Sequence, residues 1–266
     1  MKLFKKQPAQ SSFGSLHAVF FLLLVLTIAP PDGFAQLVNI EKDRKEQKEG
    51  FQGNAALSLT LTKNTTSIFQ ISNQINLQYH KDPHTVLFLN NIGLMQVDGD
   101  NLINNGFQHL RYNYEVTDDL LTLEAFTQHQ YNTIRLLQRR FLLGAGPRLK
   151  VLEGESVAIF LAPLVMYEYE QLSNDQQTQT RKFKGDLYFS GSLQLGERLF
   201  FSHTTYYQPD FAAFSEFRLA SDTSLDVKIS NRFSLQVAFD YLYDSHPPQD
   251  VPNTFYTLRN GLRYSF

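Results

Sequence analysis

Histidines and carboxylates at short spacing are the residues in this sequence that could hold a metal ion. His80 and His84 flank an expected turn at a spacing that two metal ligands could use, but no carboxylate cluster accompanies them. Asp98 and Asp100 lie in the stretch DGDN, which lacks the remaining ligands of a calcium loop. We therefore expect solvated turns at these positions, and we predict neither a metal site nor a cofactor.

A hydroxyl nucleophile beside a histidine base would indicate a hydrolase. His203 is followed by Thr204 and Thr205, the nearest approach to such a pair on the face expected to point outward. No Ser, His and Asn set stands out on that face. A second set would lie on the inner face of the expected strands: His109, Glu115, Glu124, Ser190 and Ser202. We predict that the protein is not an enzyme.

The composition excludes several other classes. Lys and Arg number 24 against 26 Asp and Glu, and no basic patch follows the N-terminus, so we expect no nucleic-acid partner. The absence of Cys excludes disulfides, thiolate zinc sites and cysteine nucleophiles. The chain has 23 Phe and 13 Tyr but no Trp.

The N-terminus has the layout of a secretory signal. Lys2, Lys5 and Lys6 precede the short apolar run 19–29, and small residues follow a Pro pair. We expect cleavage after Ala35, with an uncleaved anchor helix as the alternative. The predicted organisation is a signal peptide at 1–35, a charged periplasmic leader at 36–50 and a β-barrel domain at 51–266. The leader is expected to be a tail, or else a plug or a contact with a periplasmic partner.

Most of the remaining chain alternates between apolar and polar residues. Phe141, Leu143 and Ala145 share one face of a segment, while Arg140 and Arg148 share the other. This period of two is typical of strands with two unlike faces. It predicts about twelve strands, near 51–62, 66–80, 84–97, 103–116, 119–132, 138–152, 155–169, 182–196, 198–209, 213–229, 231–243 and 253–266.

The lengths and connections of these segments indicate a membrane barrel. Globular strands typically have about five or six residues, whereas tilted strands crossing an outer membrane need about nine to eleven. Every second connection is tight, and most of the others are longer, such as 98–102, 170–181 and 244–252. Outer-membrane barrels show this parity, and in hydrocarbon they must close. The alternative is a soluble β-sandwich or a lipocalin-like barrel.

The last segment, RNGLRYSF, carries an expected signal for barrel insertion. Leu262, Tyr264 and Phe266 share one face of it, and Gly261 lies on the other. A terminal aromatic residue is a weak motif by itself, but here it follows a secretory signal and alternating strands. We therefore expect the barrel-assembly machinery and outer-membrane lipid to be the partners of this chain.

The residues of the inner face are expected to line a lumen. The positive candidates are Arg111, Arg140, Arg148, Lys150, Arg218, Lys228, Arg259 and Arg263. The negative candidates are Glu115, Glu124, Glu168, Asp186, Glu216, Asp222, Asp226 and Asp240. Equal numbers of the two signs favour a lumen cross-linked by ion pairs, narrow or closed at rest. A transverse field between walls of opposite sign is the alternative.

Several stretches resemble a known family. They include SLTLTKNTTSIFQISNQINLQY, GFQHLRYNYEVTDDLLTLEAFTQHQYN, GAGPRLK, MYEYEQL, TTYYQPDFAAFSEFR and NGLRYSF. Together, over residues 39–266, they resemble the salt-induced outer-membrane protein family, a domain of unknown function, in its Bacteroidetes-type members. The resemblance implies an outer-membrane β-barrel and brings no catalytic or cofactor residues.

These patterns predict an all-β, antiparallel transmembrane barrel of about twelve strands in the outer membrane of a Gram-negative bacterium. Three functions follow. The first is a porin-like conduit for small solutes or ions, because the inner face is polar. The second is a structural or partner-binding barrel, because the charges of that face are balanced. The third is an interfacial hydrolase, which depends on His203 and its neighbouring hydroxyls.

Overall fold

The structure is a computed structural model, and it describes residues 49–117 and 120–264. The expected signal peptide, nearly all of the leader and Phe266 lie outside the described residues. Within these residues, no helix is long and apolar enough to cross a membrane.

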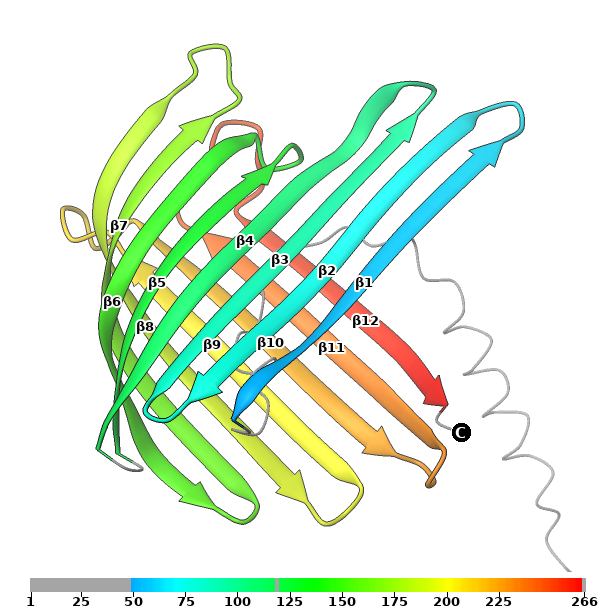
Figure 1. Ribbon diagram of the computed structural model, residues 1–266. Coiled ribbons are helices and arrows are strands. Elements are labelled where there is room, and N and C mark those ends of the chain that lie inside the picture. The colour runs from blue at the N-terminus through cyan, green and yellow to red at the C-terminus, as the bar shows by residue number, and fades with distance from the viewer. Residues whose placement is uncertain (1–48, 118–119, 265–266) are drawn as a thin grey trace, which may run out of the picture. The chain divides into compact units, whose positions relative to one another are not determined.

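Twelve strands form one antiparallel sheet in which each strand pairs with its neighbours in sequence (Figure 1). This confirms the all-β antiparallel class and the predicted number of strands. The strands are β1 Gly50–Lys63, β2 Ser67–Lys81, β3 His84–Val97, β4 Asp100–Thr117, β5 Leu121–Asn132, β6 Leu137–Gly154, β7 Val157–Leu172, β8 Gln179–Leu195, β9 Leu199–Pro209, β10 Phe217–Lys228, β11 Phe233–Asp244 and β12 Thr254–Tyr264.

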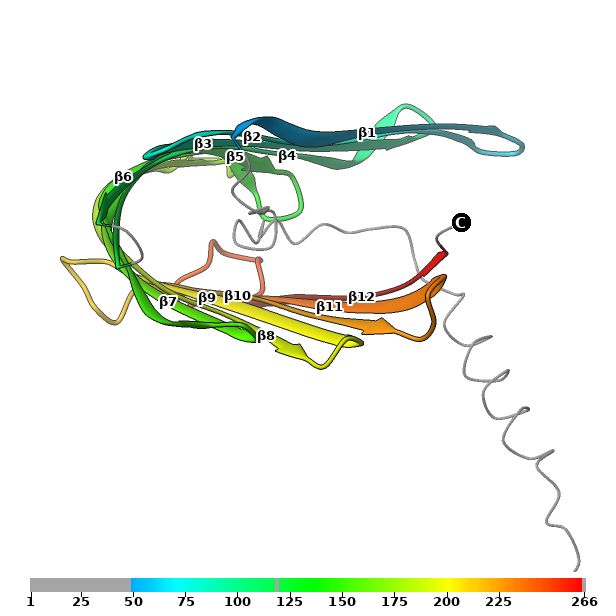
Figure 2. The ribbon, with the colours of Figure 1, turned by 60° about the horizontal axis from the view of Figure 1, so that its bottom comes forward.

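The sheet curls so that its first strands lie over its last strands, with β6 at the bend (Figure 2). Along β6, Arg140, Leu142 and Arg148 are buried, whereas Phe141 and Leu143 are exposed. Successive side chains of a strand point to opposite faces, so the alternation in the sequence has become a buried concave face and an exposed convex face. The concave face buries many polar side chains together with two apolar clusters, a larger one that includes Leu164, Met166 and Tyr206 and a smaller one of Leu87, Leu89 and Phe107.

The expected closure of the sheet is not present. Within residues 49–117 and 120–264, the ladders run from β1 to β12 without one that joins β12 back to β1. Each edge strand therefore has a partner on one side only, and large apolar residues at the edges, such as Phe51, Leu57 and Tyr256, are strongly exposed. The contacts that cross the interior lie on β4–β11 and reach β12 through the pair Arg135 and Phe255.

The connections show the expected alternation in length from the β5–β6 connection onward, and two predictions about them are corrected. The tight set comprises 82–83, 118–120, 155–156, 196–198 and 229–232, and the other set comprises 64–66, 98–99, 133–136, 173–178, 210–216 and 245–253. The expected loop at 98–102 was wrong: Asp98 and Gly99 adopt φ values of 52° and 95°, which suit a two-residue hairpin turn. The strand expected from residue 213 begins only at Phe217, so Glu216 lies in a connection.

Candidate functional site

The predicted inner-face residues occupy three kinds of position. The buried ones are Arg111, Glu124, Arg140, Arg148, Glu168, Asp186, Arg218, Asp222 and Asp240. Glu115, Lys150, Asp226 and Arg259 are half-buried, and Lys228 is exposed at the end of β10. Arg263 lies in β12. Glu216 is half-buried in the β9–β10 connection, where it accepts a hydrogen bond from Lys182.

One group of buried polar residues joins two walls of the curled sheet, and we call it the cross-wall cluster: Arg111, Glu124, Arg148 and Tyr188. Tyr188 on β8 donates a 2.6 Å hydrogen bond through its hydroxyl to Glu124 Oε2 on β5. Arg111 Nη1 donates to the same oxygen at 3.2 Å. The Arg148 guanidinium lies 3.6 Å above the Phe160 ring. The cluster therefore ties β4–β6 to β8 through the interior.

A second group, which we call the arginine–carboxylate cluster, comprises Arg140, Glu168, Glu170, Lys184, Arg218 and Asp244. Glu168 accepts a hydrogen bond from Arg140 Nε at 2.6 Å and forms an ion pair with Lys184 Nζ at 2.7 Å. Arg218 on β10 pairs with Asp244 Oδ2 at 2.6 Å and with Glu170 Oε2 at 2.7 Å. Buried charges need such partners because their desolvation is costly, and here the partners come from five strands, β6–β8, β10 and β11.

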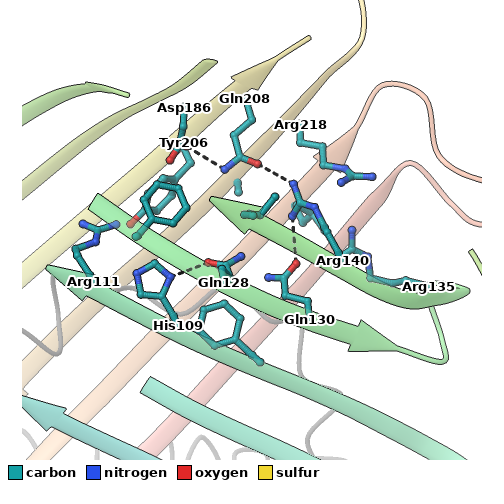
Figure 3. A pocket seen from close by; sticks show the side chains of 15 residues that line it. His109, Arg111, Gln128, Gln130, Arg135, Arg140, Asp186, Tyr206, Gln208 and Arg218 are labelled. Atoms are coloured by element: carbon teal, nitrogen blue, oxygen red, sulfur yellow. Dashed lines mark hydrogen bonds between the residues drawn. The ribbon is translucent and has the colours of Figure 1, made fainter. Parts of the chain in front are cut away.

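A cavity of about 60 Å³ is lined by residues of both clusters (Figure 3). Gln128, Gln130 and Gln208 line it together with Asp186 and His109. Gln208 links the walls because it donates to Asp186 at 2.9 Å and accepts from Arg140 at 3.3 Å. Pockets that hold drug-sized ligands measure about 300–1,000 Å³, so this interior has room only for water or a small ionic group.

Arg135 also lines this cavity, although the sequence did not identify it. It belongs to the β5–β6 connection, where Leu136 has a φ of 52° and Asn132 Oδ1 accepts a hydrogen bond from the Arg135 backbone N–H. Strand parity assigns a face only to residues within strands. A loop side chain that enters the interior gives no such signal.

The residues that suggested hydrolytic chemistry are bonded to hydroxyl and amide groups. His203 lies on the convex face, where its ring nitrogens bond Thr223 and Thr205 hydroxyls, each at 2.8 Å. Ser221 bonds Thr205 rather than the histidine. On the concave face, Ser190 bonds Thr204, Ser202 bonds Ser224, and His109 bonds Gln128.

The expected turn histidines point to opposite faces of the hairpin β2–β3. His80 is buried and bonds Thr85, whereas His84 is exposed and bonds Tyr112. A single ion could not bind both. Across the part of the chain that the structure describes, no group of three or more His, Asp or Glu residues is placed to hold a metal ion.

A separate polar group anchors the β9–β10 connection. Lys182 Nζ lies 2.9 Å from Asp210 Oδ2 and 2.5 Å from Glu216 Oε2. Burial alone would raise the pKa of Asp210, but hydrogen bonds from Lys182 and from the Ala212 backbone N–H hold it below its usual value. The hydrogen bond from Lys182 also lowers the pKa of the Glu216 carboxyl.

The molecule is thus a curled, twelve-stranded antiparallel sheet with charged clusters on its buried face. The chain belongs to a family described as "Protein of unknown function, DUF481", whose model matches residues 53–266. This membership confirms the expected resemblance to a domain of unknown function. No curated protein matches the sequence.

Solved porin structures are similar to the sheet at low sequence identity. The NanC porin is 9% identical, and the similarity covers 79% of this chain and 100% of that one, with a TM-score of 0.45. The KdgM porin in complex with disordered oligogalacturonate is also 9% identical, with 76% and 96% covered and a TM-score of 0.37. At these identities and TM-scores, the function of this chain has to be argued from its own geometry.

Proposed function

We propose that this protein is a transmembrane β-barrel of a Gram-negative outer membrane and acts as a narrow conduit for small solutes or ions. The observation that carries this proposal is the inverted distribution of polarity. Leu143, Val165 and Phe183 on the convex face are 64%, 59% and 67% exposed, while Arg111 and Glu168 on the concave face are each 1% exposed. Soluble proteins rarely expose apolar patches beyond a few hundred Å², whereas a lipid-facing wall requires them.

Three further features support the membrane assignment. The strands have 11 to 18 residues, which is enough to cross an outer membrane at a tilt. From the β5–β6 connection onward, short and longer connections alternate as expected for periplasmic and external ends. The N-terminal pattern of a secretory signal would deliver the chain to the periplasm.

A conduit in lipid also requires the sheet to close. Unpaired backbone groups at an edge cost several kcal/mol each in hydrocarbon. With an even number of strands, β1 and β12 run in opposite directions and can form an antiparallel ladder. We therefore propose that β12 pairs with β1 in the membrane.

A structural or partner-binding barrel is the second candidate, and the cross-wall cluster favours it. The bond from Tyr188 to Glu124 and the cavity of about 60 Å³ leave little space for passage. In a conduit, these contacts would be the closed gate. In a structural barrel, they would be a permanent internal brace.

Conductance of the refolded protein in planar bilayers separates the two candidates. We expect small or rare openings in the wild type and larger, more frequent openings in Tyr188→Phe, because that change removes a contact between walls. Tyr112→Phe is the matched control, since Tyr112 is exposed on the convex face. If the wild type and both variants are silent while their heat-modifiable migration proves folding, the conduit is wrong and the structural barrel stands.

A further inference from the structure

The cavity beneath the β5–β6 connection is lined by charges of predominantly one sign. Four arginines line it, Arg111, Arg135, Arg140 and Arg218, against one carboxylate, Asp186 (Figure 3). Arg111, Arg140 and Arg218 form ion pairs with carboxylates outside this lining (Glu124, Glu168, Glu170 and Asp244), so the positive excess belongs to the lining alone. A cavity with this lining attracts anions because nearby positive charge favours a bound negative group.

Two of these arginines already have their nitrogens engaged. Arg140 donates to Glu168, Gln130 and Gln208. Arg218 donates to Asp244, Glu168 and Glu170. Both guanidinium charges are therefore already paired with carboxylates.

Arg135 differs from both. Within residues 49–117 and 120–264, its guanidinium makes no hydrogen bond or ion pair, and its side-chain contact is with the face of the Phe255 ring at 5.8 Å. Burial and the positive charges of Arg218 and Arg140 lower the pKa of Arg135 to about 10, against the opposing effect of the Glu170 and Asp244 carboxylates. It is therefore still a cation at neutral pH, and an anion beside it would offset the repulsion between the three guanidinium groups.

The glutamines that line the same cavity present donors as well. Gln130 uses its side-chain oxygen to accept from Arg140, and Gln128 uses its oxygen as the partner of His109 Nδ1. Both amide NH₂ groups are then available to the cavity. A guanidinium and two amide donors around a volume of about 60 Å³ match the size and bonding of a carboxylate or phosphate group.

Arg135 also lines a second, smaller cavity under the Pro-rich β11–β12 connection, next to Pro247 and Pro248. The side chain thus lies between this connection and the interior. We propose that Arg135, with Gln128 and Gln130, forms an anion-binding site at this end of the barrel, which takes the carboxylate or phosphate group of a small solute. This site adds a class of solute to the proposed conduit. It rests on that proposed function, because the solute would reach the site through the conduit.

Calorimetric titration of the full-length barrel in detergent micelles with inorganic phosphate tests this site without requiring conductance. We expect saturable binding in the wild type and an affinity at least about tenfold weaker in Arg135→Gln, because a charge-assisted hydrogen bond is lost. Arg139→Gln is the matched control: it removes the same charge from an exposed neighbour on β6 and should bind phosphate like the wild type. Sodium acetate in a second series distinguishes a carboxylate ligand from a phosphate ligand.

Arg135→Lys keeps a cation at the position and should retain more affinity than Arg135→Gln, which guards against a variant that merely folds poorly. Equal phosphate affinity in Arg135→Gln and the wild type would overturn the site, as would the absence of saturable binding of both anions to the folded wild type. A barrel that binds phosphate but never conducts would leave the site standing and remove the conduit. A barrel that conducts but binds neither anion would leave the conduit standing and remove the site.

Discussion

Single residues of the concave face show what the alternation of the sequence can and cannot predict. Period two places Arg111 and Glu124 on the inner face, because strand residues alternate strictly between faces. It does not say which residue meets them from the opposite wall. Tyr188 reaches Glu124 through the curl of the sheet, and Arg135 enters the interior from a loop. Both contacts depend on how the sheet curves in three dimensions, so the pattern of the sequence alone does not predict them.

The Tyr188 hydroxyl should contribute measurably to stability. Tyr188→Phe leaves the buried Glu124 carboxylate with one hydrogen bond fewer, and we expect the free energy of unfolding to fall by about 1–2 kcal/mol. Urea unfolding of the barrel in lipid vesicles measures this. Tyr256→Phe, on an exposed residue of β12, should change it by less than about 0.5 kcal/mol. An equal effect of the two substitutions would contradict the role of the cross-wall cluster.

The Lys182 anchor of the β9–β10 connection should respond to acid. Because the pKa values of Asp210 and Glu216 are lowered in the folded protein, their stabilising contribution is complete above the ordinary carboxylate pKa of about 4 and is lost as the pH falls below it. The chain has no Trp, so Phe214→Trp provides a single Trp in this connection, whose emission is excited separately from that of the 13 Tyr. Its emission should change between about pH 4 and pH 2. In a Lys182→Met background the change should be weaker, and an unaltered titration there would refute the anchor.

At the scale of elements, the sequence predicts the strands well and the connections less well. Most strand ends agree within about three residues, because long alternating runs give an unambiguous signal. The segment at 98–102 was misread as a longer loop because its polar residues resemble a loop, whereas Asp98 and Gly99 alone make the turn. The start of β10 was placed too early because the alternation of Glu216, Phe217, Arg218 and Leu219 begins inside the connection.

The convex face of β6 should not tolerate charge at mid-strand. Leu143→Arg is expected to destabilise the membrane-inserted barrel by about 2–4 kcal/mol, since that depth lies near the bilayer midplane. Leu152→Arg, near the end of the same strand and also exposed, should cost no more than about 1 kcal/mol. Unfolding titrations in vesicles compare the two. If both are tolerated equally while Leu142→Arg on the concave face is not, the lipid-facing side has been misassigned.

At the scale of the molecule, the proposed closure can be tested by cross-linking, because the chain contains no Cys. Leu59→Cys on β1 is combined in turn with Cys at Tyr256, Leu258 or Leu262 on β12, which are exposed apolar residues like Leu59. In the inserted barrel, one combination should form a disulfide on oxidation, since neighbouring strands bring Cβ atoms within reach. Leu59→Cys with Leu143→Cys on β6 is the control that should not. A folded barrel in which no β1–β12 pair cross-links would disprove this closure.

The meander of the sheet has a consequence for how the chain folds. Every ladder joins strands that follow one another in sequence, so each hairpin can form from local contacts, and hairpins form quickly compared with long-range pairings. The pairing of β1 with β12 would be the one step that spans the whole chain, and its loop-closure entropy makes it the natural slow step. A circular permutant that joins the present ends and opens the chain in the 196–198 turn would turn this long-range pairing into a local one. The slow step would then move to the new ends, between β8 and β9.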